Sequence, residues 1–286
     1  MKSSRLLIPA LLVCVSVHAQ WVNYREPGVP RLKDGKVNLS APATRTADGK
    51  PDLTGVWMHE VTTAEEMKRL YGKIIEDRIQ VDVPGMEIGT QHKYGLNILV
   101  DFKPGESPLR PEAEAVMKQR AAERNARPAD PSCGFENRGW PGAGLASEPI
   151  KIVQATKETI VLYEVGNLHR QIFADGREFP AEFDLPAYLG YSIGHWEGDT
   201  FVVETRGFNG KAALDGMGHP RSDAMDITER FHRRDFGHLD YEITFDDPKF
   251  YTRKFTVRIP HELVTDNDIF EMFCENEKDA VHMPKR

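Results

Sequence analysis

The stretch AMDITERFHRRDFGHLDYEITF, residues 224–245, alternates apolar and polar side chains on both sides of Asp235-Phe236-Gly237. Successive side chains of a strand point to opposite faces of its sheet. The pattern therefore predicts two antiparallel strands that share an apolar face and are joined by a tight turn. Glu229 is in phase with the apolar residues of the first strand, and Tyr241 with those of the second. The alternation thus places a carboxylate on the core side of the sheet.

Short alternating runs separated by turn residues begin at Ile150 and continue almost to the C-terminus. Sequential hairpins without helical crossovers are typical of an antiparallel meander, which forms a barrel or a sandwich. Gly55 and Trp57 are similar to the Gly-x-Trp opening of lipocalin-type barrels, although an ordinary strand with a core tryptophan gives the same pattern. We therefore expect a mainly β fold, an antiparallel lipocalin-like barrel. Its other strands are expected at 150–155, 159–165, 168–174, 187–193, 200–206, 253–259 and 269–275.

The N-terminal half differs in composition, with more Pro, Gly and charged residues and fewer periodic apolar runs. We expect an extended arm at 20–54 and one barrel-like domain at 55–286, with helical and loop insertions at about 62–149. A threonine cap followed by acidic residues predicts a helix at 62–77. Pro111 at the start of a helix and late arginines predict a second one at 107–126. Between them, residues 94–102 (YGLNILVDF) predict a strand.

Residues 1–19 have the features of a cleaved signal peptide. Lys2 and Arg5 precede an apolar run at 6–17 that is too short to span a bilayer, and cleavage is expected between Ala19 and Gln20. A lipid anchor at Cys14 is disfavoured because the residue before it is not small. No later segment is long and apolar enough to cross a membrane. We therefore expect a periplasmic or secreted protein.

The charge of the mature chain is acidic. Removal of Lys2 and Arg5 from the 37 basic residues leaves 35 against 44 acidic residues, a formal charge of −9. This balance argues against nucleic acid and anionic membranes as partners, and it favours a small molecule. The oligomeric state is left open.

Two cysteines remain after removal of the leader, Cys133 and Cys274. In an oxidising compartment they predict one disulfide that ties a glycine-rich middle segment to the last strand. Two unpaired thiols are the alternative, but an exposed free thiol is a liability outside the cell.

Several ionisable side chains fall on the apolar faces of the predicted strands. Arg170 is in phase with Leu168 and Ile172, and Glu229 is inward on its own strand. Glu164 and Glu204 are possible companions, since each shares a face with apolar residues. A buried Arg170–Glu229 ion pair with no chemical role is one explanation. The other is that these groups form the floor of a ligand cavity in a small barrel.

The loop GFNGKAALDGMGHPRSD, residues 207–223, is longer than a hairpin requires and is rich in glycine. It delivers His219 and Ser222 to the start of the strand that carries Glu229. A histidine at a barrel mouth near carboxylates is a candidate general acid or base, although a lone loop histidine more often bonds to local backbone. We also consider Trp196, Glu204 and Tyr241, together with Glu164 and Ser222, as candidates for substrate binding.

Other motifs are weaker. GYSIG at 190–194 matches the nucleophile pattern Gly-x-Ser-x-Gly, but Ser192 lies within an alternating run and not at a strand–helix elbow. HELVT at 261–265 lacks the second histidine of a zinc-protease helix, and there is no phosphate loop or dinucleotide fingerprint. No cofactor is predicted. A divalent metal held by His219 and Asp223 is an alternative without the spacing of known zinc sites.

Several long motifs resemble a family of exported bacterial proteins. They are residues 46–57 (TADGKPDLTGVW), Tyr163-Glu164 with RQIFADGR at 170–177, and the segments 190–209, 218–252 and 273–279. The resemblance covers nearly the whole mature chain and lends weight to Glu164, Arg170, His219, Ser222 and Glu229 as a set. It names no reaction. The chain departs from the family's Cys-x-Pro pattern at residues 133–135, where it has Cys-Gly-Phe.

These features lead to one functional hypothesis with two rivals. The leading hypothesis is an exported enzyme, a hydrolase or lyase, that performs acid/base chemistry on a small organic or glycosidic molecule bound in the barrel. His219 would transfer the proton, Glu229 would orient it and Arg170 would hold an anionic oxygen. The rivals are a binding barrel without catalysis and a metal-dependent hydrolase.

Overall fold

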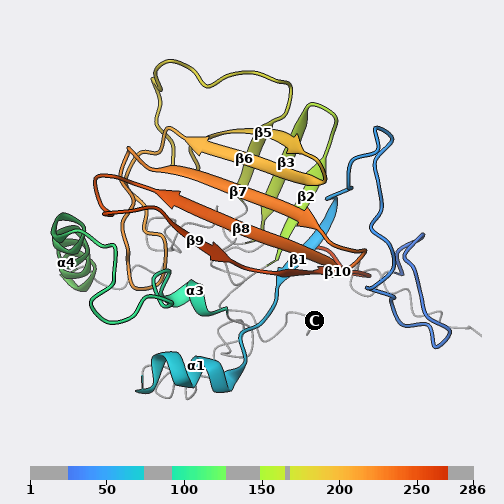
Figure 1. The fold of residues 1–286 in the computed structure, drawn as a ribbon, viewed down its shortest axis with the longest axis horizontal. Coiled ribbons are helices and arrows are strands. Elements are labelled where there is room, and N and C mark those ends of the chain that lie inside the picture. Colours follow the sequence, from blue (N-terminus) through green and yellow to red (C-terminus); the bar gives the residue numbers. More distant parts are fainter. Residues whose placement is uncertain (1–24, 74–91, 127–148, 165–167, 270–286) are drawn as a thin grey trace, which may run out of the picture.

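The computed structural model describes residues 25–73, 92–126, 149–164 and 168–269. Their strands form one ten-stranded sheet in the order β10-β1-β2-β3-β4-β5-β6-β7-β8-β9. Strand β10 also pairs with β8, and this pairing closes β1–β8 and β10 into a nine-stranded barrel (Figure 1). The strands are β1 Gly55–His59, β2 Ile150–Gln154, β3 Glu158–Tyr163, β4 Leu168–Phe173, β5 Tyr191–Glu197, β6 Thr200–Arg206, β7 Asp226–Arg233, β8 His238–Asp246, β9 Phe255–Arg258 and β10 His261–Val264. The predicted lipocalin-like barrel is confirmed.

The pairing departs from a simple meander at one place, because β4 and β5 are parallel. Residues 174–190 return the chain to the end of the barrel at which β4 begins, without forming a strand of their own. Strand β5 therefore begins at Tyr191 and not at residue 187. Aromatic contacts hold this crossover in place, with Phe183 and Phe179 packed beside Tyr191. A connection of this length allows two neighbouring strands to run in the same direction.

Strand β10 is absent from the sequence-based expectation, yet it closes the barrel. His261 and Glu262 pair with β8, and the whole strand pairs with β1. Its four residues alternate between buried and exposed positions, but a run of this length gives too weak a pattern to recognise. The strand expected at 269–275 lies outside the described residues apart from Ile269, which is not in a strand. The predicted signal peptide at 1–19 and both cysteines of the predicted disulfide, Cys133 and Cys274, also lie outside the described residues.

The barrel interior follows the predicted alternation. Phe231 of β7 stacks on Tyr241 of β8, and Trp57 of β1 is completely buried. One end of the barrel contains the turns at 154–158 and 197–200. The interior near this end is packed with apolar side chains. A hollow there has no room for a water molecule, and it is lined by Leu53, Ile152, Thr159, Val161, Ile172, Phe201 and Phe231.

The described residues contain three helices outside the barrel: α1 Ala64–Tyr71, α3 Lys93–Leu96 and α4 Pro111–Ala126. The N-terminal arm lies at one end of the barrel, and α3 and α4 lie towards the opposite end (Figure 1). The strand predicted at 94–102 is wrong, because the chain forms α3 followed by turns. Tyr94 of α3 is buried, as are Ile98 and Leu99 of the turns that follow, and these positions lack the strict alternation of a strand. Among the described helices, none is long and apolar enough to cross a membrane.

Arg233, at the end of β7, fastens the N-terminal arm to the barrel. Its buried guanidinium donates to the hydroxyl of Thr44 at 3.0 Å, to the carbonyl oxygen of Asp52, and to that of Phe236 on its own turn. Next to it, the amide of Gly237 donates to the carbonyl oxygen of Leu39 at 2.7 Å. A Cβ at residue 237 would lie 2.5 Å from that of Leu39, which explains the glycine.

We expect Arg233→Met to lower the free energy of unfolding by about 2–4 kcal/mol, because it leaves buried carbonyl oxygens without their donor. Urea unfolding measures this loss, and proteolysis of the arm should accelerate in the variant. Arg234→Gln is the control, since Arg234 is exposed and its side chain pairs with the exposed Asp240, so its effect should stay within about 0.5 kcal/mol. Equal effects of the two substitutions would contradict the anchoring role.

Candidate functional site

Inside the barrel, Arg170 and Glu229 form a buried ion pair. The two guanidinium nitrogens of Arg170 donate to the two carboxylate oxygens of Glu229 at 2.8 and 3.0 Å, and the hydroxyl of Tyr241 donates to the same carboxylate. The side chains of Arg170 and Glu229 are 2% and 0% exposed. Sequence alternation therefore places all three residues correctly. The pair is the one expected for a structural role, because each buried charge has its counter-charge at hydrogen-bond distance.

The charges of this pair govern the titration of the tyrosines around it. Burial, together with the charge of Glu229, holds the pKa of Tyr241 well above its usual value. Burial raises the pKa of Tyr163 to about 12, with a further rise from Glu229 that the charge of Arg170 opposes. Burial by itself would lower the pKa of Arg170, but the charge of Glu229 raises it above the usual value. Both tyrosines are therefore neutral, and Arg170 is charged, at any physiological pH.

Three histidines that the sequence analysis did not group together lie at the end of the barrel nearer α3. His261 of β10 lies 5.5 Å from the ring of Tyr241 and 6.4 Å from that of His59 on β1. His92, which precedes α3, packs at 4.6 Å against His59. The Nδ1 of His261 contacts the carbonyl oxygen of Ile259 at 2.6 Å. Since a carbonyl only accepts, this nitrogen carries the proton of a neutral imidazole.

The loop between β6 and β7 contains a second polar pair, Asp215 and His219. The Nδ1 of His219 lies 2.5 Å from Oδ2 of Asp215, and both side chains are almost fully buried. Tyr251 fixes the loop beside them, because its hydroxyl donates to the carbonyl oxygen of Pro220 at 2.8 Å. The sequence suggested Glu229 as the partner of His219, but Glu229 is engaged by Arg170, and the neighbour in space is Asp215. Its i, i+4 spacing from His219 was the available signal.

Asp215 is surrounded by hydrogen-bond donors. Its carboxylate accepts from the amides of Ile98, Gly218 and His219 at 2.6, 2.9 and 3.1 Å, in addition to the imidazole. Since the carboxylate of Asp215 is the acceptor in all of these contacts, the proton shared with His219 is assigned to Nδ1. The Nε2 then presents a lone pair. It makes no hydrogen bond to the described residues and is not fully enclosed.

Ser222 is occupied structurally. Its hydroxyl donates to Asp247 at 2.8 Å and accepts from the amide of Ala224 at 3.0 Å, while its own amide donates to Asp247 at 2.7 Å. These bonds fasten the end of the loop to the residue after β8. Ser222 therefore positions the loop and has no hydroxyl proton free for a substrate.

The other predicted residues are dispersed. Glu164 is buried, but it follows the last residue of β3, whose inward face carries Val161 and Tyr163 and not Ile160 and Leu162. Glu204 faces outward with a side chain 38% exposed, so its predicted inward orientation is wrong. Val202, its neighbour on that face, is buried there, which made the outer face look like the core. Trp196 lies near the C-terminal end of β5, where the ammonium group of Lys50 from the N-terminal arm lies over its ring.

The described residues contain no cluster of three or more His, Cys, Asp or Glu arranged to hold a metal ion. Asp223, the metal partner considered for His219, instead forms an exposed ion pair with Lys249 at 2.6 Å. In His219 itself, the Nδ1 is committed to Asp215. Of the two ring nitrogens, Nε2 is the one open to a proton or a ligand.

Comparisons with protein-family models, with curated proteins and with solved structures find no match to this chain. The resemblance to a family of exported bacterial proteins therefore stays a prediction from its motifs. Chemistry has to come from the geometry of the site itself. Among the predicted site residues, the geometry offers His219, whose Nε2 makes no hydrogen bond to the described residues, and the buried ion pair Arg170–Glu229.

We expect Arg170→Met and Glu229→Met each to lower the free energy of unfolding by about 3–5 kcal/mol, because either change leaves the partner's buried charge unpaired. The double variant Arg170→Met/Glu229→Met should recover most of that loss. Urea unfolding of the four proteins measures the coupling. Arg230→Gln, which breaks the exposed pair with Glu197 on the outer face of β7, should cost at most about 1 kcal/mol. Additive losses would contradict the pairing.

A second prediction concerns pH. Burial lowers the pKa of His261 from 6.5 to about 3, so between these values the unfolded chain binds a proton that the folded protein does not. Stability should therefore fall as the pH drops through this window, by up to ~1.4 kcal/mol per pH unit from this residue. Urea unfolding of the wild type and of His261→Phe at pH 7, 6, 5 and 4 measures the difference in slope. Parallel pH dependences would show that His261 does not titrate in this way.

Proposed function

We propose that the protein is an exported enzyme that uses His219 as a general base in hydrolysis or elimination on a small organic or glycosidic molecule. One observation carries the proposal: Asp215 holds the imidazole through Nδ1 and leaves Nε2 without a partner among the described residues. A histidine oriented in this way by a carboxylate is the arrangement used for proton transfer. Export rests on the predicted signal peptide at residues 1–19.

The two residues have separate roles in such a step. Nε2 of His219 would accept a proton from the substrate or from an attacking water, and the ring would become an imidazolium. The charge of Asp215 stabilises that cation and fixes the tautomer, without itself becoming protonated. The imidazolium could then return the proton to the leaving group, which completes hydrolysis or elimination by one residue acting as base and then as acid.

The proposed site lies at the rim of the barrel and not within it. The pair Arg170–Glu229 is saturated, and the apolar hollow at the arm end has no room for water. We therefore assign Arg170 and Glu229 a structural role and move the active centre to the β6–β7 loop. A binding protein without catalysis is the alternative, in which His219 would donate or accept a hydrogen bond to a ligand.

The test begins with a thermal-shift screen of small metabolites on the mature protein, followed by product analysis of every hit. Turnover should fall about 10²–10⁴-fold in His219→Ala and in Asp215→Asn, since the first lacks the base and the second no longer fixes its tautomer. The exposed His232 of β7 provides the matched control, and His232→Ala should keep full activity. Circular dichroism checks that each variant is folded.

Two results would decide against the enzyme. A ligand that binds but is recovered unchanged would support the binding protein. Unchanged turnover in folded His219→Ala and Asp215→Asn would remove the dyad as the active centre.

A further inference from the structure

The carboxylate of Asp215 has a second bonding partner that comes from a distant part of the chain. Its Oδ2 accepts from Nδ1 of His219 at 2.5 Å and from the amide of Ile98 at 2.6 Å. Ile98 lies in residues Lys93–Asp101, which we call the strap. One oxygen atom thus connects the imidazole to the strap. Any shift of Ile98 changes the position that this oxygen can take.

The strap is attached to the His219 loop by backbone bonds as well. The amide of Gly216 donates to the carbonyl oxygen of Gly95, and that of Met217 donates to the carbonyl oxygen of Leu96, both at 2.9 Å. The contact is tight, because a Cβ at Gly216 would lie 3.2 Å from a methyl carbon of Leu96 and 3.3 Å from the carbonyl oxygen of Gly95. The strap and the loop therefore move as one unit while these bonds hold.

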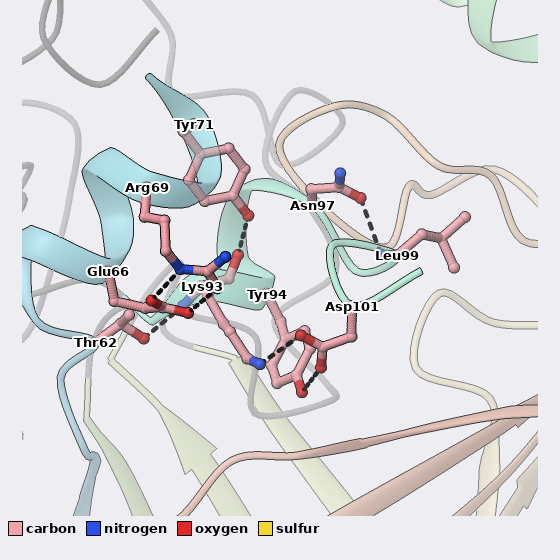
Figure 2. Close-up of polar contacts among 9 residues, drawn as sticks. All are labelled: Thr62, Glu66, Arg69, Tyr71, Lys93, Tyr94, Asn97, Leu99 and Asp101. Carbon is pink, nitrogen blue, oxygen red and sulfur yellow. Dashed lines mark hydrogen bonds and ion pairs between the residues drawn. The ribbon is translucent and has the colours of Figure 1, made fainter. Parts of the chain in front are cut away.

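The strap is closed on itself by one carboxylate, as Figure 2 shows. Asp101 accepts from the ammonium group of Lys93 and from the hydroxyl of Tyr94, each at 2.5 Å. We call these three residues the clasp. It holds the two ends of the strap together, and the side chain of Tyr94 is buried beneath it. Charge-assisted bonds of this kind are stronger than neutral ones and fix geometry.

Helix α1 supports the strap from the other side. The hydroxyl of Tyr71 donates to the carbonyl oxygen of Lys93, and the hydroxyl of Thr62 accepts from its amide at 2.9 Å (Figure 2). Burial, and with it the charge of Asp215, raises the pKa of Tyr71 well above its usual value. Tyr71 is therefore a neutral donor close to Asp215.

We propose that Lys93, Tyr94 and Asp101 are positioning residues for His219, which act through Ile98 and the shared oxygen of Asp215. With the clasp closed, the Ile98 amide holds the carboxylate in line with Nδ1; with the clasp broken, the carboxylate loses a donor and gains freedom to rotate. The consequence for turnover rests on the proposed function of the dyad. The structural coupling itself does not, because it requires no substrate.

Proton NMR tests the coupling without a substrate. The Nδ1–H of an imidazole bonded to a carboxylate should give a far-downfield signal, and its loss in His219→Ala assigns it. Asp101→Asn should accelerate the exchange of both this proton and the Ile98 amide about tenfold, because both depend on the same local opening. Asp240→Asn removes a comparable exposed carboxylate from its pair with Arg234 and should leave both rates unchanged.

A second variant disturbs the contact between strap and loop directly, so the test does not depend on Asp101→Asn alone. Gly216→Val places a side chain against Leu96 and Gly95 and should raise the same two exchange rates together. Faster exchange of Ile98 with an unaltered His219 signal, in either variant, would overturn the coupling, as would unchanged rates in both. Once a substrate is known, coupled exchange in a protein whose His219→Ala variant retains turnover would refute the proposed function alone.

Discussion

Closure of the sheet through β10 is the constraint on which the rest of the molecule depends. His261 and Glu262 join β8, while the same strand pairs along its length with β1, so no open seam remains between the first and last strands of the barrel. A closed sheet seals its interior from water. Every polar side chain that faces inward must then find its partner inside, since an unpaired charge there would be prohibitively costly. Arg170, Glu229 and Tyr241 meet this requirement among themselves.

The same constraint separates structure from chemistry. The buried carboxylate of Glu229 already accepts three hydrogen bonds from Arg170 and Tyr241, so its charge is paired within the barrel and is not directed at a substrate. At the rim the condition is relaxed, because a group there can be held on one side and open on the other. Asp215 and His219 have this asymmetry: the carboxylate accepts from four donors, while Nε2 of the imidazole it holds makes no hydrogen bond within the described part of the chain. The acid/base chemistry that we propose is therefore assigned to the rim.

The sequence was informative where one physical rule acted alone. Alternation placed Arg170, Glu229 and Tyr241 inside because each lies in the middle of a long strand with a clear period of two. It failed for Glu204, where the outer face of β6 buries Val202 as well and the two faces look alike. The local pattern is of the same kind in both cases. Whether it predicts the inward face correctly depends on which outer residues are buried by distant segments.

The remaining features depend on contacts between residues far apart in the chain. Strand β10 is too short to show a period of two. The segment YGLNILVDF resembles a strand because it is rich in apolar residues, and the burial of Tyr94 and Ile98 is decided by contacts that its local pattern does not show. The partner of His219 was misassigned for a related reason. Glu229 is the nearest carboxylate by alternation, whereas Asp215 becomes a partner only when the loop folds back on itself.

The insertion between β1 and β2 gives this loop its fixed shape. Ile98 and Asp215 are 117 residues apart, yet the bond between them is one of the short contacts at the site. A glycine-rich loop at a barrel rim would by itself sample many conformations, and an imidazole in it would have no defined direction. Backbone bonds from the strap, and the clasp that holds the strap closed, remove that freedom. The helices outside the barrel therefore support the His219 loop, and their docking would give the proposed base at the rim a fixed direction.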